Sequence, residues 1–370
     1  MRIGIDFRMA GVQNGGLGRY VLELTKAILK SDSTNEYFLF CREPEAAGPF
    51  TSLPNVRLIK ADFRHYSFSE QIFFPRLLNR FALDLVHFPN FNVPIAYKRP
   101  FVVTIHDLIH HKIGGVKKTN LLHFWAYKEV ISRAARAAKA VITVSQQSKK
   151  DIQKELSIPA EKISVIYEGV SLLSNVADKE ISRAKARYFL DKPYFIFVGV
   201  LQRNKNLPAL VEGFALFQQK YGQPFHLVIA GKSDPHYPEI KARCLLSPSA
   251  NDLVFTGSIS DDDLKALYAG ARAFVSASVL EGFGLPGLEA AAFGVPLAVS
   301  NLPVFNEIYE DAAIYFDPGS VEEISQCLKL LAFDEKFHGQ VSRSALKRAS
   351  FFSWEKCAKE TLEVYKSLKY

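Results

Sequence analysis

The chain alternates short runs of β-branched and aromatic residues with helical patterns, and it does so in two successive series. The first series runs from "RIGIDF" at residues 2–7 to "KISVIYEG" at residues 162–169, and the second opens with "YFIFVGV" at residues 194–200. Parallel strands need long crossover connections, so this alternation predicts a parallel sheet with helices on both faces. The sequence therefore predicts an α/β fold with two tandem, doubly wound, Rossmann-like domains.

The length of 370 residues also favours two hydrophobic cores over one. A polar stretch at residues 171–192 marks the junction, which gives an N-terminal domain of residues 1–172 and a C-terminal domain of residues 173–350. The last segment is amphipathic and has no strand after it. Ligands of doubly wound sheets bind beyond the carboxyl ends of the strands, so we expect a binding cleft between the two domains.

Cysteine usage and the start of the chain bear on its compartment. Met1 leads directly into a predicted strand without the pattern of a signal peptide, and no apolar run reaches the roughly 18 residues of a membrane span. The four cysteines are far apart, which argues against a zinc knuckle and a disulfide framework. We expect buried thiols in a cytoplasmic protein.

The net positive charge of the chain is confined to its first half. Residues 1–170 carry 24 Lys and Arg against 15 Asp and Glu, whereas residues 171–370 carry 22 against 23. Such a field suits an anionic partner, which at this point is a nucleic acid, a phosphorylated substrate or an anionic membrane surface. A solvated basic face without a partner explains the same asymmetry.

Two loops after predicted strands carry residues suited to phosphate. The glycine-rich turn "GVQNGGLGRY" at residues 11–20 enters a helix at about Arg19, but its spacing is not that of a dinucleotide-binding motif, so a flexible connection is the alternative. In the loop "VGVLQRNKNLPAL", Arg203 and Lys205 suit a diphosphate, and the alternative is a pair of surface cations.

The stretch "EGFGLPGLE" at residues 281–289 places two carboxylates eight positions apart around a glycine-rich turn. Glu281 follows the predicted strand "RAFVSAS", and Pro286 suits the first turn of the next helix. Carboxylates accept hydrogen bonds from hydroxyls, which sugars and riboses offer in pairs. We therefore expect Glu281 to bind a hexose and Glu289 a ribose, with backbone amides of the turn between them.

This stretch resembles the E-x7-E motif of family 4 glycosyltransferases, which are retaining enzymes of GT-B architecture that use nucleotide-diphosphate sugars. Other segments look like landmarks of that family, in the family's order, over residues 1 to about 330: "GGLGRY", "VHFPNF", "VVTIHDL", "TVSQQSKKDI", "ISVIYEGV", "VGVLQRNKN" and "AAIYFDP". The "GGLGRY" and "RNKN" neighbourhoods look similar to mannosyltransferases of bacterial surface polysaccharide assembly. The resemblance implies that a final helix, at about residues 351–370, packs back on the N-terminal domain.

The resemblance also implies a role for each matching residue. It implies that Gly16 lies near the donor phosphates and the acceptor, that His106 lines the sugar site and that Lys205 binds diphosphate. It implies that the sugar is held by the side chain of Glu281, through its hydroxyls, and by the amides of Phe283, Gly284 and Leu285. Glu289 would bond the ribose, and the backbone near Ile259 would face the base. Val200 departs from the family pattern by replacing a frequent arginine, and Arg203 is the candidate substitute. Glu168 stands where asparagine is common, which we interpret as structural.

The expected mechanism needs no enzyme base. Glu281 and Glu289 lie on two sides of a turn, unlike the paired acids of retaining glycosidases. The resemblance implies that the donor's own phosphate accepts the proton of the incoming hydroxyl, while Arg203 and Lys205 neutralise charge on the leaving diphosphate. For His106 we favour hydrogen bonding to sugar hydroxyls over proton transfer. A metal site in "HDLIHH" is disfavoured because no defined ligand spacing follows His106.

The sequence thus predicts a retaining, metal-independent hexosyltransferase without a cofactor. Its donor would be a nucleotide sugar, for which we favour GDP-mannose. Its acceptor would be a saccharide or a lipid-linked saccharide of surface polysaccharide assembly, and we expect no nucleic acid partner. Contact with the inner face of an anionic membrane stays open, because residues 114–139 mix basic and apolar side chains that also suit a core helix. The alternative functions are a nucleotide-sugar epimerase and a non-catalytic sugar-nucleotide-binding protein.

Overall fold

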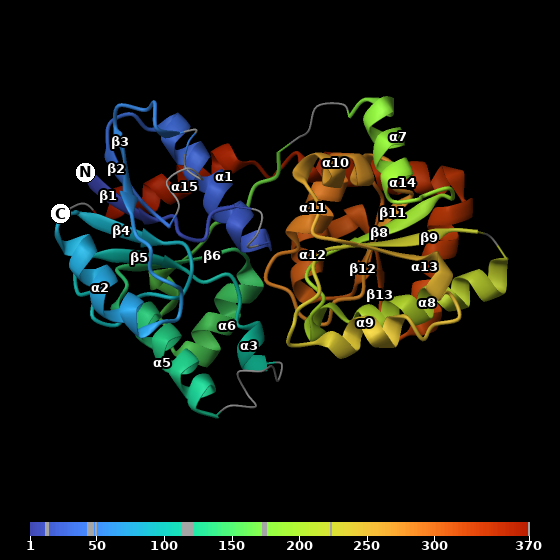
Figure 1. Cartoon of the computed structure of the whole chain (residues 1–370), viewed down its shortest axis with the longest axis horizontal. Helices are drawn as coiled ribbons and strands as arrows, with labels where there is room; N and C mark the ends of the chain where they lie inside the picture. Colours follow the sequence, from blue (N-terminus) through green and yellow to red (C-terminus); the bar gives the residue numbers. More distant parts are fainter. Residues whose placement is uncertain are drawn as a thin grey trace. The chain divides into compact units, whose positions relative to one another are not determined.

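The computed structural model describes residues 1–11, 15–42, 48, 50–112, 121–171, 176–222 and 224–368. It divides into unit 1, Met1–Gly169 with Trp354–Tyr370, and unit 2, Val170–Ser353 (Figure 1). Within the described residues each unit has one sheet, of seven strands in unit 1 and six in unit 2, and the strands pair in parallel. The predicted class of two doubly wound α/β sheets is confirmed.

The sheet of unit 1 has the strand order β3-β2-β1-β4-β5-β6-β7. Its strands are β1 (Arg2–Asp6), β2 (Glu36–Cys41), β3 (Val56–Lys60), β4 (Leu85–Phe88), β5 (Phe101–Thr104), β6 (Ala140–Thr143) and β7 (Ile163–Val165). Its helices are α1 (Gly15–Ser31), α2 (Phe68–Asn79), α3 (Ile109–Lys112), α5 (Leu121–Ala137), α6 (Gln146–Leu156), the 3-10 turn η3 (Ala160–Lys162) and α15 (Trp354–Ser367). Figure 1 shows α1 and α15 on one side of this sheet and α2 and α5 on the other. The strand order reverses between β1 and β4, which marks the ligand-binding edge of such sheets.

Aromatic side chains build much of the unit 1 core. Phe40 of β2 meets Phe74 of α2 at 5.8 Å between ring centroids, and Phe88 of β4 meets Phe101 of β5 at 5.6 Å. Both pairs are edge to face, the geometry that ring quadrupoles favour. All residues of β4 and β5 are buried, as expected for parallel strands covered on both faces.

The sheet of unit 2 has the order β10-β9-β8-β11-β12-β13, and its order reverses between β8 and β11. Its strands are β8 (Tyr194–Val198), β9 (His226–Ala230), β10 (Leu253–Gly257), β11 (Ala273–Ser276), β12 (Leu297–Ser300) and β13 (Ala313–Phe316). Its helices are α7 (Asp178–Arg187), η4 (Arg203–Lys205), α8 (Leu207–Tyr221), α9 (Pro238–Cys244), η5 (Ala250–Asp252), α10 (Asp261–Ala269), α11 (Leu285–Ala292), α12 (Pro303–Tyr309), η6 (Glu310–Ala312), α13 (Val321–Phe333) and α14 (Glu335–Ala349). Figure 1 shows α10, α11 and α14 on one side of the sheet and α8, α9 and α13 on the other.

Several local features follow directly from the sequence. Ser260 caps α10 by accepting a hydrogen bond from Asp263 N at 3.1 Å, as its acidic first turn predicts. All four cysteines are buried and free, as expected. The polar stretch at residues 171–192, by contrast, contains α7, which belongs to unit 2 and is tied to α10 by a 2.7 Å ion pair between Arg187 and Asp263. Ala184 is the buried residue of α7, and a single buried position gives no periodic apolar stripe from which this helix could be predicted.

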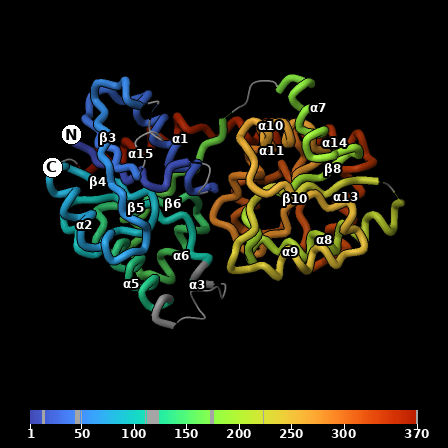
Figure 2. The backbone as a smooth tube through the Cα atoms, in the orientation of Figure 1, coloured from blue at the N-terminus to red at the C-terminus, as the bar shows by residue number. Residues whose placement is uncertain are grey.

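The last helix, α15, packs along α1 in unit 1 (Figure 2). Its Tyr365 hydroxyl is hydrogen-bonded to His87 Nδ1 at 2.6 Å, and His87 Nε2 lies 2.8 Å from Thr104 Oγ1. Burial lowers the pKa of His87 to about 3, so this imidazole stays neutral at physiological pH. The final turn of the helix is therefore hydrogen-bonded to the centre of the unit 1 sheet.

We predict that Tyr365→Phe destabilises the protein by about 1–3 kcal/mol, because it leaves the buried His87 Nδ1 without its hydrogen-bond partner. Urea unfolding followed by circular dichroism measures the loss. Ser367→Ala, which alters an exposed hydroxyl of the same helix, is the control and should change little. Equal stability of Tyr365→Phe and the parent protein would contradict the prediction.

Candidate active site

Lys205 and Glu281 meet beyond two neighbouring strands of the unit 2 sheet. β8 leads into η4, which ends at Lys205, and β11 leads into the loop that carries Glu281. Lys205 Nζ lies 2.6 Å from Glu281 Oε1, and the two side chains are 17% and 12% exposed. Because β8 and β11 flank the reversal of strand order, the pair occupies the place where open α/β sheets bind ligands.

Hydrogen bonds within and between the two loops fix this arrangement. Ser278 Oγ donates to Glu281 Oε1 at 2.7 Å. The Asn204 side chain donates to Leu280 O at 3.2 Å, and Asn204 O accepts from Val279 N at 2.8 Å. The cation and the carboxylate are therefore positioned by the protein itself, which is the arrangement that electrostatic catalysis requires.

The start of α11 is held by a buried tyrosine. Gly284 has a φ of 102°, a left-handed conformation that favours glycine, and Pro286 lies in the first turn as predicted. The Tyr309 hydroxyl donates to Gly284 O at 2.5 Å, and burial raises the pKa of this hydroxyl well above its usual value. A Cβ on Gly287 would lie 2.3 Å from Tyr309 Oη. Tyr309 thus fixes the turn that carries the predicted sugar-binding amides.

The remaining predicted donor residues of unit 2 lie around this turn and the loop after β10. Phe283 is buried and packs edge-on against Phe352 at 5.9 Å, and Leu285 is buried at the first position of α11. Glu289 lies on the second turn of α11, where its Oε2 accepts from Tyr268 Oη at 3.2 Å. Ile259 is partly buried in the loop between β10 and α10.

Arg203 does not join the Lys205–Glu281 pair. Its Nη2 lies 3.4 Å from Glu239 Oε1, and its guanidinium lies over the Tyr237 ring at 5.2 Å. The Arg203 and Glu239 side chains are both more than half exposed, so their attraction is weakened by solvent. Arg203 is therefore paired with Glu239 at the surface, whereas the Lys205 side chain points to Glu281.

In unit 1, the predicted glycine lies at the start of α1. The helix begins at Gly15, earlier than the predicted entry near Arg19, because Gly15 takes a φ of 61° that redirects the chain. Gly16 is exposed in the first turn, and a Cβ there would meet nothing within 4 Å. The residues before it in the glycine-rich turn, 12–14, lie outside the described residues.

His106 has protein partners at both ring nitrogens. Nε2 donates to Pro89 O at 3.0 Å, and Nδ1 lies 3.2 Å from Glu168 Oε1. Burial works against the charged imidazolium, but the hydrogen bond and negative charge of Glu168 outweigh it and raise the pKa of His106. Both partners accept hydrogen bonds, so this geometry favours a charged ring that donates from both sides. The Tyr20 ring packs edge-on at 4.5 Å and fixes its plane.

The neighbouring histidine of "HDLIHH" has a different partner. His111 Nδ1 lies 3.0 Å from Tyr127 Oη, and Asp107 Oδ1 accepts from Ile109 N at 2.9 Å. The side chain of His110 lies outside the described residues. In the described part of the chain, no three His, Cys, Asp or Glu side chains are grouped as metal ligands, and no helix is long and apolar enough to cross a bilayer.

Two protein families match consecutive parts of this chain. "Glycosyltransferase Family 4" matches residues 14–172, and "Glycosyl transferases group 1" matches residues 178–348. The chain belongs to the group 1, family 4 glycosyltransferases. The predicted resemblance to family 4 glycosyltransferases is confirmed, and the E-x7-E stretch lies within the second of the two matches.

Relatives of this glycosyltransferase include bacterial mannosyltransferases. It is 26% identical to O-antigen chain mannosyltransferase B of Escherichia coli, over 95% of this chain and 96% of that one. It is 30% identical to the serotype-specific mannosyltransferase WbdA of Escherichia coli, over 72% of this chain and 33% of that longer protein. The crystal structure of HepE from Anabaena, in complex with UDP and glucose, covers 99% of both chains with a TM-score of 0.77 and 17% identity. That likeness confirms the expected GT-B fold.

Three supporting residues of the site were not predicted from the sequence. Asn204 lies inside the "RNKN" segment, and Ser278 lies three positions before Glu281, so both had a local signal in their neighbourhood. Tyr309 lies 25 positions from the carbonyl that it holds, and no local pattern marks it. Glu168, interpreted as structural, is the ion-pair partner of His106.

We predict that Gly287→Ala costs about 1–3 kcal/mol of stability, since its methyl group would collide with the buried Tyr309 ring. Thermal and urea unfolding measure the cost. Gly339→Ala in α14 is the matched control, because its nearest neighbour is the flexible end of Arg343, and it should be neutral or stabilising. A Gly287→Ala variant as stable as Gly339→Ala would refute the conclusion that Tyr309 packs closely against this turn.

We also predict that Glu168→Gln lowers the pKa of His106, because it removes the charge that keeps the imidazolium stable. The raised pKa contributes stability that is fully present below about pH 6.5, the unfolded value, and is lost as pH rises through the folded value. An NMR titration of the His106 ring protons measures the change. Glu161→Gln, at an exposed carboxylate on η3, should leave the titration unchanged.

Proposed function

We propose that this glycosyltransferase moves a mannosyl group from GDP-mannose, with retention and without a metal ion or cofactor, to a saccharide or lipid-linked acceptor of surface polysaccharide assembly. The contact of Lys205 Nζ with Glu281 Oε1, at the strand-order reversal of unit 2, supports this proposal. A cation and a hydroxyl-binding acid at one point match the junction between a diphosphate and its sugar.

Lys205 would act on the leaving group. Its ammonium, held by Glu281 before the donor binds, would turn to the diphosphate oxygens and neutralise the charge that grows on them as the glycosidic bond breaks. Glu281 would then accept hydrogen bonds from sugar hydroxyls, with Ser278 keeping its carboxylate in place. The positive end of the α11 dipole adds to the same field.

The proton of the acceptor hydroxyl would pass to a donor phosphate oxygen on the face from which the leaving group departs. We assign His106 no proton transfer, since both of its nitrogens have hydrogen-bond acceptors within the protein. A charged His106 would instead donate to an oxygen of the sugar after releasing Pro89 O, or support the field around it.

The names of the relatives support mannose as the transferred sugar. O-antigen chain mannosyltransferase B matches almost the whole chain, and WbdA matches nearly three quarters of it. We place the reaction in the cytoplasm, at the inner face of the membrane. On α5, Tyr127 and Ile131 face the core, while Trp125 is 71% exposed beside the basic Lys128, which supports weak contact with anionic lipid.

We expect Lys205→Met and Glu281→Gln each to lower kcat by about 10²- to 10³-fold, which is the usual cost of removing one preorganised electrostatic group. The assay measures GDP released from GDP-mannose in the presence of a mannosylated acceptor, with the anomeric configuration of the product read by NMR. Release of GDP only when acceptor is present separates transfer from epimerisation.

The matched control is Lys192→Met. Lys192 forms a 2.5 Å ion pair with Asp252 in the same unit but precedes β8, at the opposite edge of the sheet. It should leave kcat unchanged, and activity in EDTA should equal that in buffer. Full activity of Lys205→Met, or an inverted product, would overturn the proposed mechanism.

Donor identity is tested by thermal shift with GDP-mannose, UDP-glucose and ADP-glucose. A ligand at 100 times its dissociation constant stabilises by about 2.7 kcal/mol, which shifts the transition measurably. We expect GDP-mannose to give the largest shift and Lys205→Met to reduce it.

A further inference from the structure

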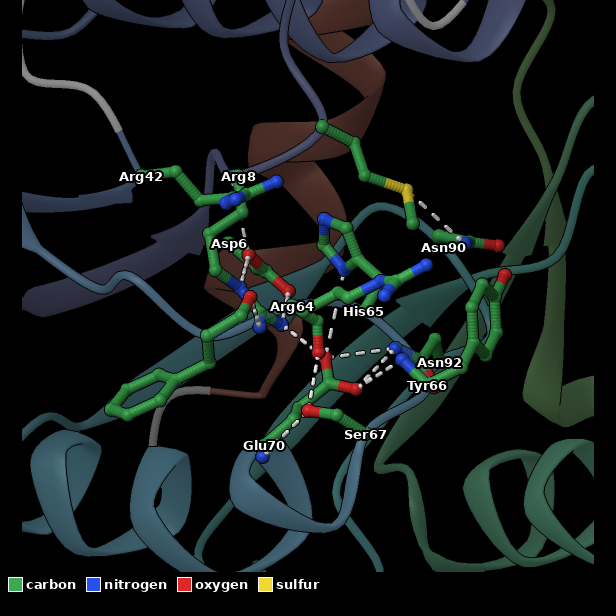
Figure 3. Close-up of polar contacts among 12 residues, drawn as sticks. Asp6, Arg8, Arg42, Arg64, His65, Tyr66, Ser67, Glu70, Asn90 and Asn92 are labelled. Carbon is green, nitrogen blue, oxygen red and sulfur yellow. Dashed lines mark hydrogen bonds and ion pairs between the residues drawn. The ribbon is translucent and has the colours of Figure 1, made fainter.

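A second group of polar side chains lies at the carboxyl edge of the unit 1 sheet (Figure 3). Its members come from the ends of three strands, the segments that follow them and the start of α2: Asp6 at the end of β1 and Arg8 after it, Arg64, His65 and Tyr66 after β3, Asn90 and Asn92 after β4, and Glu70 on α2. This edge includes the strand-order reversal between β1 and β4, so it is the ligand-binding edge of unit 1.

A buried ion network forms the base of this group. The Arg8 side chain is fully buried and binds both oxygens of Asp6 at 2.7 Å and Glu70 Oε1 at 2.8 Å, with its guanidinium 3.9 Å from the centre of the Phe74 ring. Burial opposes ionisation of the two carboxyl groups, but Arg8 and the neighbouring hydrogen bonds hold both pKa values below their usual range. Glu70 is therefore a charged group in the interior.

The second oxygen of Glu70 holds the loop above it. Glu70 Oε2 accepts a hydrogen bond from Tyr66 N at 2.7 Å, and Asn92 Nδ2 donates to the same carboxylate at 2.8 Å and 2.9 Å. Ser67 caps α2 by accepting from Glu70 N at 3.2 Å. The loop before α2 is thus anchored at its backbone by a buried negative charge.

The anchored residue, Tyr66, has an unfavourable backbone conformation and an exposed ring. Its φ is 61°, a left-handed value that is rare for a bulky side chain, and it is 57% exposed. Burial of the hydroxyl raises the pKa of Tyr66, and the Asn90 side chain, toward which the hydroxyl points in Figure 3, acts in the opposite direction. Strain of this kind persists where the surroundings impose it, and here the hydrogen bond from Tyr66 N to Glu70 Oε2 holds the Tyr66 backbone in this conformation.

We propose that the Tyr66 ring is a stacking platform for one sugar ring of the saccharide acceptor, an inference that rests on the proposed transfer function. The C–H face of a pyranose suits the negative face of an aromatic ring, and the Phe91 ring supports Tyr66 at 6.1 Å. The Arg64 guanidinium is exposed and has no partner among the described residues, so it is available to sugar hydroxyls at the rim. Glu70 is a positioning residue that acts through Tyr66 N.

The test measures saccharide binding without donor, by saturation-transfer NMR and calorimetry with mannotriose, maltotriose and cellotriose. The parent protein should bind mannotriose, Tyr66→Phe should bind it equally, and Tyr66→Gly should bind it about tenfold more weakly or less. Glycine relieves the left-handed strain, so Tyr66→Gly should unfold at the same or a higher temperature than the parent. A folding defect therefore cannot mimic the loss.

Phe189→Gly is the matched control. Phe189 also has a left-handed φ of 56° and is 86% exposed, but it lies in unit 2 before β8, away from the carboxyl edge of that sheet. It should keep full mannotriose binding. Absence of saccharide binding by the parent, equal binding by Tyr66→Gly, or an equal loss in Phe189→Gly overturns the platform.

Failure of this inference is distinguishable from failure of the proposed function. The GDP-mannose thermal shift reports the donor site of unit 2 and should be the same in Tyr66→Gly and the parent. In the transfer assay, Tyr66→Gly should raise KM for the acceptor and leave KM for GDP-mannose unchanged. If GDP-mannose raises the unfolding temperature but Tyr66→Gly does not change KM for the acceptor, the stacking platform is refuted and the proposed function is not.

Discussion

Parallel strand pairing determines where the loops of both units meet. Parallel pairing brings the carboxyl ends of all strands in a sheet to one edge, so loops far apart in the sequence become neighbours. Lys205 and Glu281 are 76 positions apart, yet they form a 2.6 Å contact because β8 and β11 lie side by side. The same rule gathers Tyr66, Glu70 and Asn90 at the edge of unit 1. In both units the candidate site residues lie beside the reversal of strand order, while the cores beneath are closely packed apolar residues.

Much of the fold and part of the site could be predicted from the sequence. Alternating strand and helix patterns gave the two α/β sheets, and local chemistry gave the Ser260 cap and the place of Pro286, because these signals act over a few residues. Lys205 and Glu281 were identifiable as candidates from their motifs. Their direct contact was not, since it depends on which strands are neighbours.

What the sequence did not reveal depends on long-range packing. The hydroxyl of Tyr309 binds the backbone of a turn 25 residues away, and Glu168 raises the pKa of a histidine 62 residues away. The Arg203 guanidinium lies beside Tyr237 and Glu239 at the start of α9, two partners that no local pattern marks, and its contact with a diphosphate stays a prediction. These contacts form between residues that become neighbours only once the helices and strands have packed.

The docking of α15 on unit 1 has a consequence for how the protein is made. The strands of unit 1 are complete at Val165, but His87 receives its hydroxyl partner from a residue 278 positions later. At about 5–20 residues per second, the ribosome needs roughly 15 to 55 s to cover that distance. Unit 2 can finish folding first, while the apolar flank of α1 stays uncovered and open to chaperones. Unit 1, whose strands are synthesised first, is thus the last unit to complete its packing.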